Sequence, residues 1–190
     1  TLSSSSAASD VYKRQVNGVD WVYTSADKTL VLSGSGTLGE DVADFGLFGG
    51  SWVAEHVKIG ADVNITTGRV FENFDFVDEY EVDANNKYLC NPDGVLMDKD
   101  KTVLIKYPAG SKEFSFYTVP DTVKTISYRA FEFSSALKTI FLNDGLETIE
   151  NFAFDNCGNL LYITIPGTVT SMGKGVLAQC NLLNLSLIHI

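Results

Sequence analysis

Apolar residues in the C-terminal part of the chain recur at a fixed spacing of 23 residues. Seven registers agree in size and polarity across three consecutive repeats. They are Val119, Leu142 and Ile165; Val123, Leu146 and Val169; Ile126, Ile149 and Met172; Ala130, Ala153 and Val176; Phe131, Phe154 and Leu177; Ser134, Cys157 and Cys180; and Leu137, Leu160 and Leu183. Such a period predicts a solenoid, in which each unit buries its apolar side against its neighbours.

Each repeat has a strand signal followed by a corner. Residues 137–142 and 160–165 share the pattern LxxLxL, whose last three residues alternate as in a short strand. Pro, Gly and Asn follow at once and favour a turn. An Ala-Phe dipeptide comes next, where we expect a short helical turn. The pattern predicts a β-rich solenoid with a parallel sheet on one face and short helical turns and irregular coil on the other.

The same register extends towards the N-terminus. Ile59 and Val82 are again 23 residues apart, although Thr66 stands where other repeats carry Ile or Met, so we expect Ile65 to take its place. From Val82 to Val119 the interval is 37 residues, one repeat plus 14. Two apolar runs around a charged turn fill the excess, which predicts a β-hairpin insertion around residues 88–108.

The pattern divides the chain into four segments. We predict a small N-terminal β cap over residues 16–53 and leucine-rich repeats over residues 54–184. Residues 1–15 and 185–190 lack the periodicity and resemble translated sequencing-adapter sequence, so we predict non-native tails there. The alternative for the first segment is a genuine serine-rich linker. Because neither interpretation supplies a start methionine or a secretion signal, we expect a piece of a longer protein.

Composition and charge limit the class of partner. The 190 residues are 45% hydrophobic, which is enough for one core, and no apolar run is long enough to span a membrane. The formal net charge is −10. This charge disfavours nucleic acid and anionic membranes and suits a solvated extracellular surface or a cationic partner.

Three sequence features resemble a known family. They are the repeat pattern IPxxVxxIxxxAFxxC, the insertion DGVLMDKDKTVLIKYPAG at residues 93–110, and a GSGTL segment after Trp21. Together they resemble the Treponema-type, BspA-like leucine-rich repeat family of bacterial surface proteins, with residues 54–183 well covered. The resemblance implies a secreted or surface-exposed protein that binds macromolecules through its repeats and has no enzymatic activity.

Candidate chemistry is sparse. His56 is the only histidine outside the predicted tails, and a lone exposed histidine beside a carboxylate is typical of surface decoration. Asp93, Asp98 and Asp100 are clustered, but their spacing does not match a calcium loop and lysines alternate with them. A solvated hairpin tip is favoured. We predict no catalytic, cofactor-binding or metal-binding residues.

Cys157 and Cys180 share one repeat position, which indicates a small buried side chain. The expected spacing of stacked coils, about 4.8 Å, is compatible with a disulfide. Side chains in a ladder point the same way, however, which makes the required torsion awkward. We therefore favour packed free thiols.

The strand frame also predicts which side chains point outwards. Aromatic and apolar groups on a solvated sheet face commonly mark contact sites, and acidic groups beside them can steer a basic partner. The predicted partner-binding residues are Phe116, Phe141, Leu161, Tyr162, Asp78, Glu79 and Glu81. The alternative is that flanking coils or the missing part of the protein cover this patch.

Three classes of function follow. The favoured one is a non-catalytic, cell-surface or secreted interaction module, adhesive in character, that binds a protein or glycan through its sheet face. The runner-up is a passive spacer array attached to a larger secreted enzyme or cell-wall protein. An enzyme in its own right ranks third.

Overall fold

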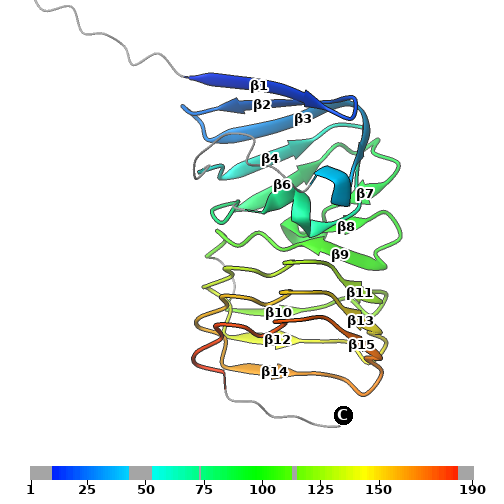
Figure 1. The fold of residues 1–190 in the computed structure, drawn as a ribbon, viewed down its shortest axis with the longest axis vertical. Coiled ribbons are helices and arrows are strands. Elements are labelled where there is room, and N and C mark those ends of the chain that lie inside the picture. The colour runs from blue at the N-terminus through cyan, green and yellow to red at the C-terminus, as the bar shows by residue number, and fades with distance from the viewer. Residues whose placement is uncertain (1–9, 43–52, 73, 113–114, 184–190) are drawn as a thin grey trace, which may run out of the picture.

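The chain folds into a stack of coils that runs from an N-terminal β segment to the last repeat (Figure 1). The computed structural model describes residues 10–42, 53–72, 74–112 and 115–183. Successive coils pair in parallel at the predicted spacing of 23 residues, as Thr139 pairs with Tyr162 and Thr148 with Ser171. The predicted β-rich repeat solenoid is confirmed.

The first sheet contains the N-terminal strands. Its members are β1 (Val11–Val16), β2 (Val19–Thr24), β3 (Thr29–Leu38), β4 (His56–Ile59), β5 (Asp62–Ile65) and β6 (Glu79–Val82). Strands β1 to β3 form an antiparallel meander, and β3 then pairs in parallel with both β4 and β5. Strand β6 pairs with β4 and ends this sheet.

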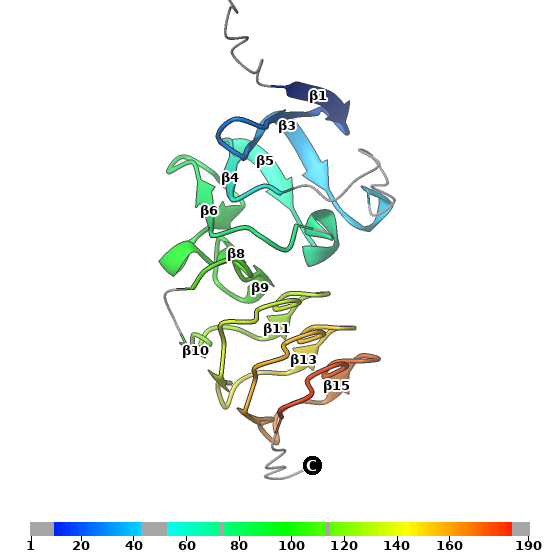
Figure 2. The ribbon, with the colours of Figure 1, turned by 90° about the vertical axis from the view of Figure 1, so that its left-hand side faces the viewer.

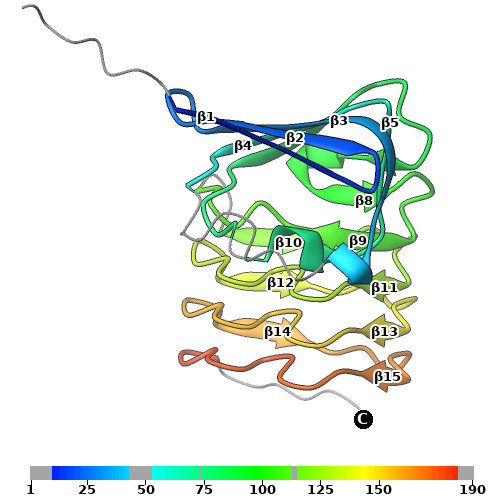
Figure 3. The same ribbon diagram turned by 45° about the horizontal axis from the view of Figure 1, so that its top comes forward.

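The C-terminal coils contribute to two further sheets. One contains β10 (Phe116–Thr118), β12 (Thr139–Phe141) and β14 (Tyr162–Thr164). The other contains β7 (Leu89–Cys90), β8 (Leu96–Asp98), β9 (Val103–Lys106), β11 (Thr125–Ile126), β13 (Thr148–Ile149) and β15 (Ser171–Met172). The two run along different sides of the stack (Figures 2 and 3). The second repeat sheet adds to the single sheet that we expected.

The insertion is an integral wall of the stack, buried between two hydrophobic clusters, and does not project from the surface. Strands β8 and β9 form the predicted antiparallel hairpin, and β9 then pairs in parallel with β11 as a coil strand would. Both faces of this wall are buried. Leu96 and Ile105 join the N-terminal hydrophobic cluster, whereas Met97 and Leu104 join the C-terminal one. The insertion therefore divides the core while keeping the stack continuous.

In place of the predicted helical turns, the Ala-Phe segments form turns that are hydrogen-bonded from one coil to the next. The amides of Arg129, Phe131 and Phe133 donate to carbonyls of the next coil at 3.2, 2.7 and 3.1 Å. Arg129 and Phe133 have φ of 52° and 59°, which lets alternate amides point along the stack. Short 3₁₀ turns occur earlier, at η1 (Glu40–Val42), η3 (Gly68–Phe71) and η4 (Pro92–Gly94). In the described ranges no helix is long and apolar enough to cross a membrane.

A column of aromatic rings fills the C-terminal core. Tyr107 stacks on Phe131 with ring centroids 5.1 Å apart, and Phe131 stacks on Phe154 at 5.0 Å. Both distances match the separation of neighbouring parallel strands, about 4.8 Å. Ala130 and Ala153 are fully buried beside the column, where a small side chain permits close approach. The Ala-Phe dipeptide is therefore the packing signature of the coil.

Two smaller sequence expectations have structural outcomes. Ile65 is buried and Thr66 exposed, so Ile65 takes the inward place as predicted. Cys157 and Cys180 are free thiols, each 3.1 Å from the carbonyl of the phenylalanine one coil earlier, Phe131 and Phe154 respectively. The preference for packed thiols over a disulfide is confirmed.

Strand β1 lies mostly within the segment predicted as an N-terminal tail. It pairs over its whole length with β2, from Val11 opposite Thr24 to Val16 opposite Val19. The absence of apolar periodicity has a simple reason, since the first five residues of β1 are exposed on an edge strand. These residues therefore do take part in the fold. The segment 1–9 and the C-terminal tail at 185–190 lie outside the described residues.

The stacked phenylalanine column predicts a large difference between two similar substitutions. Phe154→Ala removes a fully buried ring and should lower the free energy of unfolding by about 3–5 kcal/mol. Phe141→Ala removes a ring that is 53% exposed and should change it by less than about 0.5 kcal/mol. Urea unfolding followed by circular dichroism measures both. Equal losses would show that the column does not hold the coils together.

Candidate functional site

Three exposed aromatic side chains lie on one face of the sheet β10-β12-β14. Phe116, Phe141 and Tyr162 are 58%, 53% and 57% exposed, although each ring would gain from burial. Phe116 and Tyr162 share one column, and Phe141 lies diagonally between them. Diagonal neighbours on a sheet are roughly 7–8 Å apart, so the three rings form one patch. Leu161 lies just before β14 and is half-buried, so it adds less exposed apolar surface to this patch than a fully outward position would.

The predicted acidic residues lie on or beside β6, in a different sheet from the aromatic patch. Glu79 and Glu81 are exposed, but each faces a basic side chain one coil earlier. His56 Nδ1 lies 3.6 Å from a Glu79 oxygen, and Lys58 Nζ lies 2.9 Å from a Glu81 oxygen. The hydrogen bond that the Lys58 ammonium donates to the Glu81 carboxylate raises the pKa of Lys58. Part of the predicted acidic surface is thus already neutralised.

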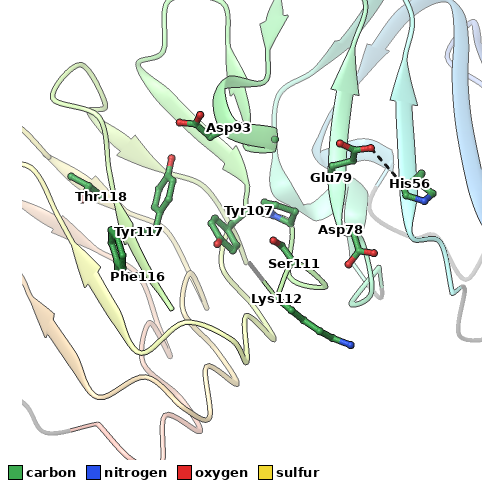
Figure 4. Close-up of a pocket in the computed structure, with 12 residues that line it drawn as sticks. His56, Asp78, Glu79, Asp93, Tyr107, Ser111, Lys112, Phe116, Tyr117 and Thr118 are labelled. Carbon is green, nitrogen blue, oxygen red and sulfur yellow. Dashed lines mark ion pairs between the residues drawn. The ribbon is translucent and has the colours of Figure 1, made fainter. Parts of the chain in front are cut away.

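A groove of about 860 Å³ separates β6 from β10 (Figure 4). Two of the predicted acidic residues and one of the predicted aromatics meet in it, namely Asp78, Glu79 and Phe116. Glu81, Phe141, Leu161 and Tyr162 do not line it. The lining is completed by His56, Asp93, Gly94, Tyr107, Pro108, Ser111, Lys112, Tyr117 and Thr118. In Figure 4, β4 and β6 side chains face those of β10 across the segment that contains Tyr107 and Ser111.

The groove exists because the insertion interrupts the sheet. Strand β6 ends the first sheet and β10 ends the sheet β10-β12-β14, so the two strands do not pair with each other. The chain that follows the insertion contacts the start of β6, where Gly110 N–H donates to Val77 C=O at 2.8 Å. A Cβ at Gly110 would lie 2.3 Å from the Phe76 oxygen, so only glycine fits there. Asn91 Nδ2 holds the other end by donating to Tyr80 C=O at 2.8 Å.

The groove has an acidic rim and an aromatic floor. Tyr107 and Tyr117 pack edge to face with centroids 5.2 Å apart. Burial raises the pKa of Tyr107 to about 12. Burial also raises the pKa of Tyr117, and the negative charge of Asp93 adds to the effect. Both phenols therefore keep their protons at neutral pH. The carboxylates of Asp78, Glu79 and Asp93 outnumber the one ammonium group of Lys112 in the lining.

Asp93 and Asp98, which are clustered in the sequence, have different surroundings in the structure. Asp98 accepts hydrogen bonds from Thr102 N–H and Oγ1 and from Val103 N–H, so it caps the hairpin turn. Asp93 lies instead in the groove. Within the part of the chain that the structure describes, no group of three acidic, histidine or cysteine side chains is placed to hold a metal ion. No hydrogen bond joins Ser111 to His56 among the described residues, although both line the groove.

The repeat frame could not identify half of the groove. Asp93, Tyr107 and Ser111 belong to the insertion or its exit, where the spacing of 23 residues does not apply. Tyr117 alternates with Phe116 and Thr118, and alternation alone favours an inward position for it. The sequence did contain a signal for the groove. The interval of 37 residues between Val82 and Val119 is not a whole number of repeats, so the strands before and after the insertion cannot stay in register.

The fold defines a class of protein, the leucine-rich repeat solenoids. Residues 109–189 match the family described as "BspA type Leucine rich repeat region (6 copies)". Residues 109–189 are therefore similar to BspA-type leucine-rich repeats, as the sequence resemblance indicated. Among curated proteins, no sequence relative was found.

Solved structures of bacterial repeat proteins are similar. A leucine-rich repeat protein from Eubacterium ventriosum matches with a TM-score of 0.61 and 20% identity over 94% of this chain and 72% of its own. The pneumococcal vaccine antigen PcpA matches with a TM-score of 0.57 and 28% identity over 64% of this chain and 36% of its own. The first similarity supports the fold alone. The second extends over a third of a longer protein.

A buried lysine directly precedes the groove residue Tyr107 in the sequence. Lys106 is 2% exposed, and its Nζ donates to the carbonyl of Arg129 at 2.8 Å. Burial lowers the pKa of Lys106 to about 8, partly offset by the carboxylate of Asp75. The folded state therefore binds fewer protons than the unfolded state between about pH 8 and the ordinary lysine value of 10.5. Folding stability must rise with pH across this window.

Lys106→Met should remove this pH dependence. As pH rises from about 8 to 10.5, the unfolding free energy of the unmodified chain should increase relative to that of the variant by on the order of 3 kcal/mol. The reason is that the buried ammonium costs stability only while it is charged. Urea unfolding of both proteins across this pH range measures the difference. A constant difference would mean that Lys106 titrates alike in the folded and unfolded chains.

Proposed function

We propose that this chain is a non-catalytic interaction module that binds a macromolecular partner through the sheet β10-β12-β14. The observation that carries the proposal is the patch of Phe116, Phe141 and Tyr162. Aromatic rings dominate the binding energy of protein interfaces because they bury a large area at a small entropic cost. Three such rings on one solvated sheet face are more than folding requires.

The location and the lack of catalysis belong to the same proposal. We place the module outside the cell or on its surface, which the acidic net charge of −10 and the family resemblance support. The name of the similar vaccine antigen also favours an accessible location. A rigid stack of coils suits binding, because its side chains are held at fixed spacings on a broad face.

The aromatic patch predicts loss of binding without loss of fold. The unmodified chain is first screened against arrays of extracellular proteins and of glycans, since either class can pack against aromatic rings. For each partner found, Phe141→Ala and Tyr162→Ala should each weaken binding about tenfold or more, as expected for interface anchors. Surface plasmon resonance gives the affinities, and thermal melting confirms that the variants stay folded.

A matched control tests whether position matters. Tyr88 is 45% exposed but lies on the corner before β7, away from the patch. Tyr88→Ala should leave binding within about twofold, in line with ordinary surface substitutions. If all three variants bind like the unmodified chain, the sheet face is not the contact surface. If no protein and no glycan on the arrays binds the chain, the passive spacer function would be favoured instead.

A further inference from the structure

The interruption of the sheet leaves β10 with an open edge. Strand β10 pairs with β12 on one side, and among the described residues it pairs with no strand on the other. The Ser115 carbonyl accepts from Thr139 N–H, and Val119 N–H donates to the Phe141 carbonyl, so the odd-numbered residues face β12. Alternate residues of a parallel strand direct their backbone groups to opposite sides. Phe116 and Thr118 therefore direct their N–H and C=O groups into the groove.

Strand β6, on the other wall, is open to a smaller extent. Gly110 N–H occupies the Val77 carbonyl at one end, and the Asn91 side chain occupies the Tyr80 carbonyl at the other. The two walls thus differ, with a backbone edge on β10 and a carboxylate rim around β6. An exposed strand edge is a template for pairing with another chain.

Charge selects the kind of chain that fits. Glu79 lies beside His56, with 3.6 Å between a carboxylate oxygen and Nδ1, whereas no ion pair within the described ranges engages Asp78 or Asp93. Lys112 supplies the only lysine or arginine charge in the lining. Tyr107 and Tyr117 add aromatic surface, on which the aliphatic stems of lysine and arginine can pack.

We propose that the groove binds an extended, lysine- or arginine-rich segment of a partner protein, which pairs as an added strand with the edge of β10. Main-chain hydrogen bonds to Phe116 and Thr118 provide the affinity, and Asp78 and Asp93 select basic side chains. The volume of about 860 Å³ lies within the range of specific ligand sites. This inference rests on the proposed function, because it names the class of partner and a second part of its contact surface.

The first test uses a defined peptide with the full chain. A blocked, fluorescently labelled peptide of alternating lysine and threonine should bind saturably, as measured by fluorescence anisotropy. The same peptide with glutamate in place of lysine should not bind. Methylation of alternate amide nitrogens in the lysine peptide removes its strand-pairing groups but keeps its charge. The two alternate sets of amides are methylated in separate peptides and then together, and binding that survives methylation of both sets together would rule out strand pairing.

The second test removes one edge donor from the protein. Thr118→Pro deletes the N–H group that faces the groove, and proline is tolerated on edge strands. Thr118→Val keeps that group and alters only the outward side chain. Proline should weaken peptide binding about fivefold, the usual worth of one backbone hydrogen bond, while valine stays within about twofold. Equal affinities for the two variants would overturn the proposed pairing, with thermal melts confirming that both are folded.

The third test separates local charge from net charge. Asp78→Asn with Asp93→Asn should weaken the lysine peptide about tenfold. Asp121→Asn with Asp144→Asn removes the same charge from exposed corners outside the groove and should change it less than about twofold. Equal effects would mean that attraction to the whole acidic chain explains the binding.

The outcomes distinguish this inference from the proposed function. If Phe141→Ala and Tyr162→Ala abolish binding of a partner while Thr118→Pro has no effect on partner or peptide, the groove proposal fails alone. If the lysine peptide binds through the β10 edge but no partner depends on Phe141 or Tyr162, the aromatic-face proposal fails alone. Competition of the peptide by a neutral glycan would assign the groove to carbohydrate and overturn the inference.

Discussion

Hydrogen bonding between coils is the interaction on which the rest of this structure depends. A coil of 23 residues has too few internal partners for its backbone, so many amides must find a carbonyl in a neighbouring coil. Short strands meet this need on two sides, and the ladder through Arg129, Phe131 and Phe133 meets it on the third. The residues with positive φ in that ladder cost roughly 1–2 kcal/mol each. The amides that they align along the stack offset this cost and keep the aromatic column in register.

The insertion preserves this bonding on one side and breaks it on another. Strand β9 takes the place of a coil strand beside β11, so the wall of the second repeat sheet is continuous. On the groove side, β6 and β10 do not pair with each other, and Gly110 N–H donates instead to the carbonyl of Val77, two residues before β6. The groove is thus the consequence of fitting 14 extra residues into a stack that tolerates only whole coils.

Much of the fold could be predicted because the repeat assigns each residue a position. The inward places of Phe131 and Phe154, and the outward places of Phe116, Phe141 and Tyr162, follow from alternation and period alone. The second repeat sheet could not be predicted, since strands of two residues such as Thr125–Ile126 are too short to show alternation. Leu161 was misplaced because β14 begins one residue later. The groove was missed because it depends on the path of the insertion, and the repeat says nothing about that path.

The distribution of charge follows from the same register. Side chains 23 residues apart lie side by side, and this brings Lys58 to Glu81 and Lys124 to Glu147, at 2.9 and 3.2 Å. Ion pairs of this exposed kind add little stability, but they neutralise the surface. Asp78 lies beside Glu55 of the preceding coil, whose carboxylate already pairs with Lys28, and among the described residues Asp78 itself forms no ion pair. Uncompensated negative charge therefore gathers where the backbone edge is open, and this coincidence makes the interruption, rather than the regular face, the more selective part of the surface.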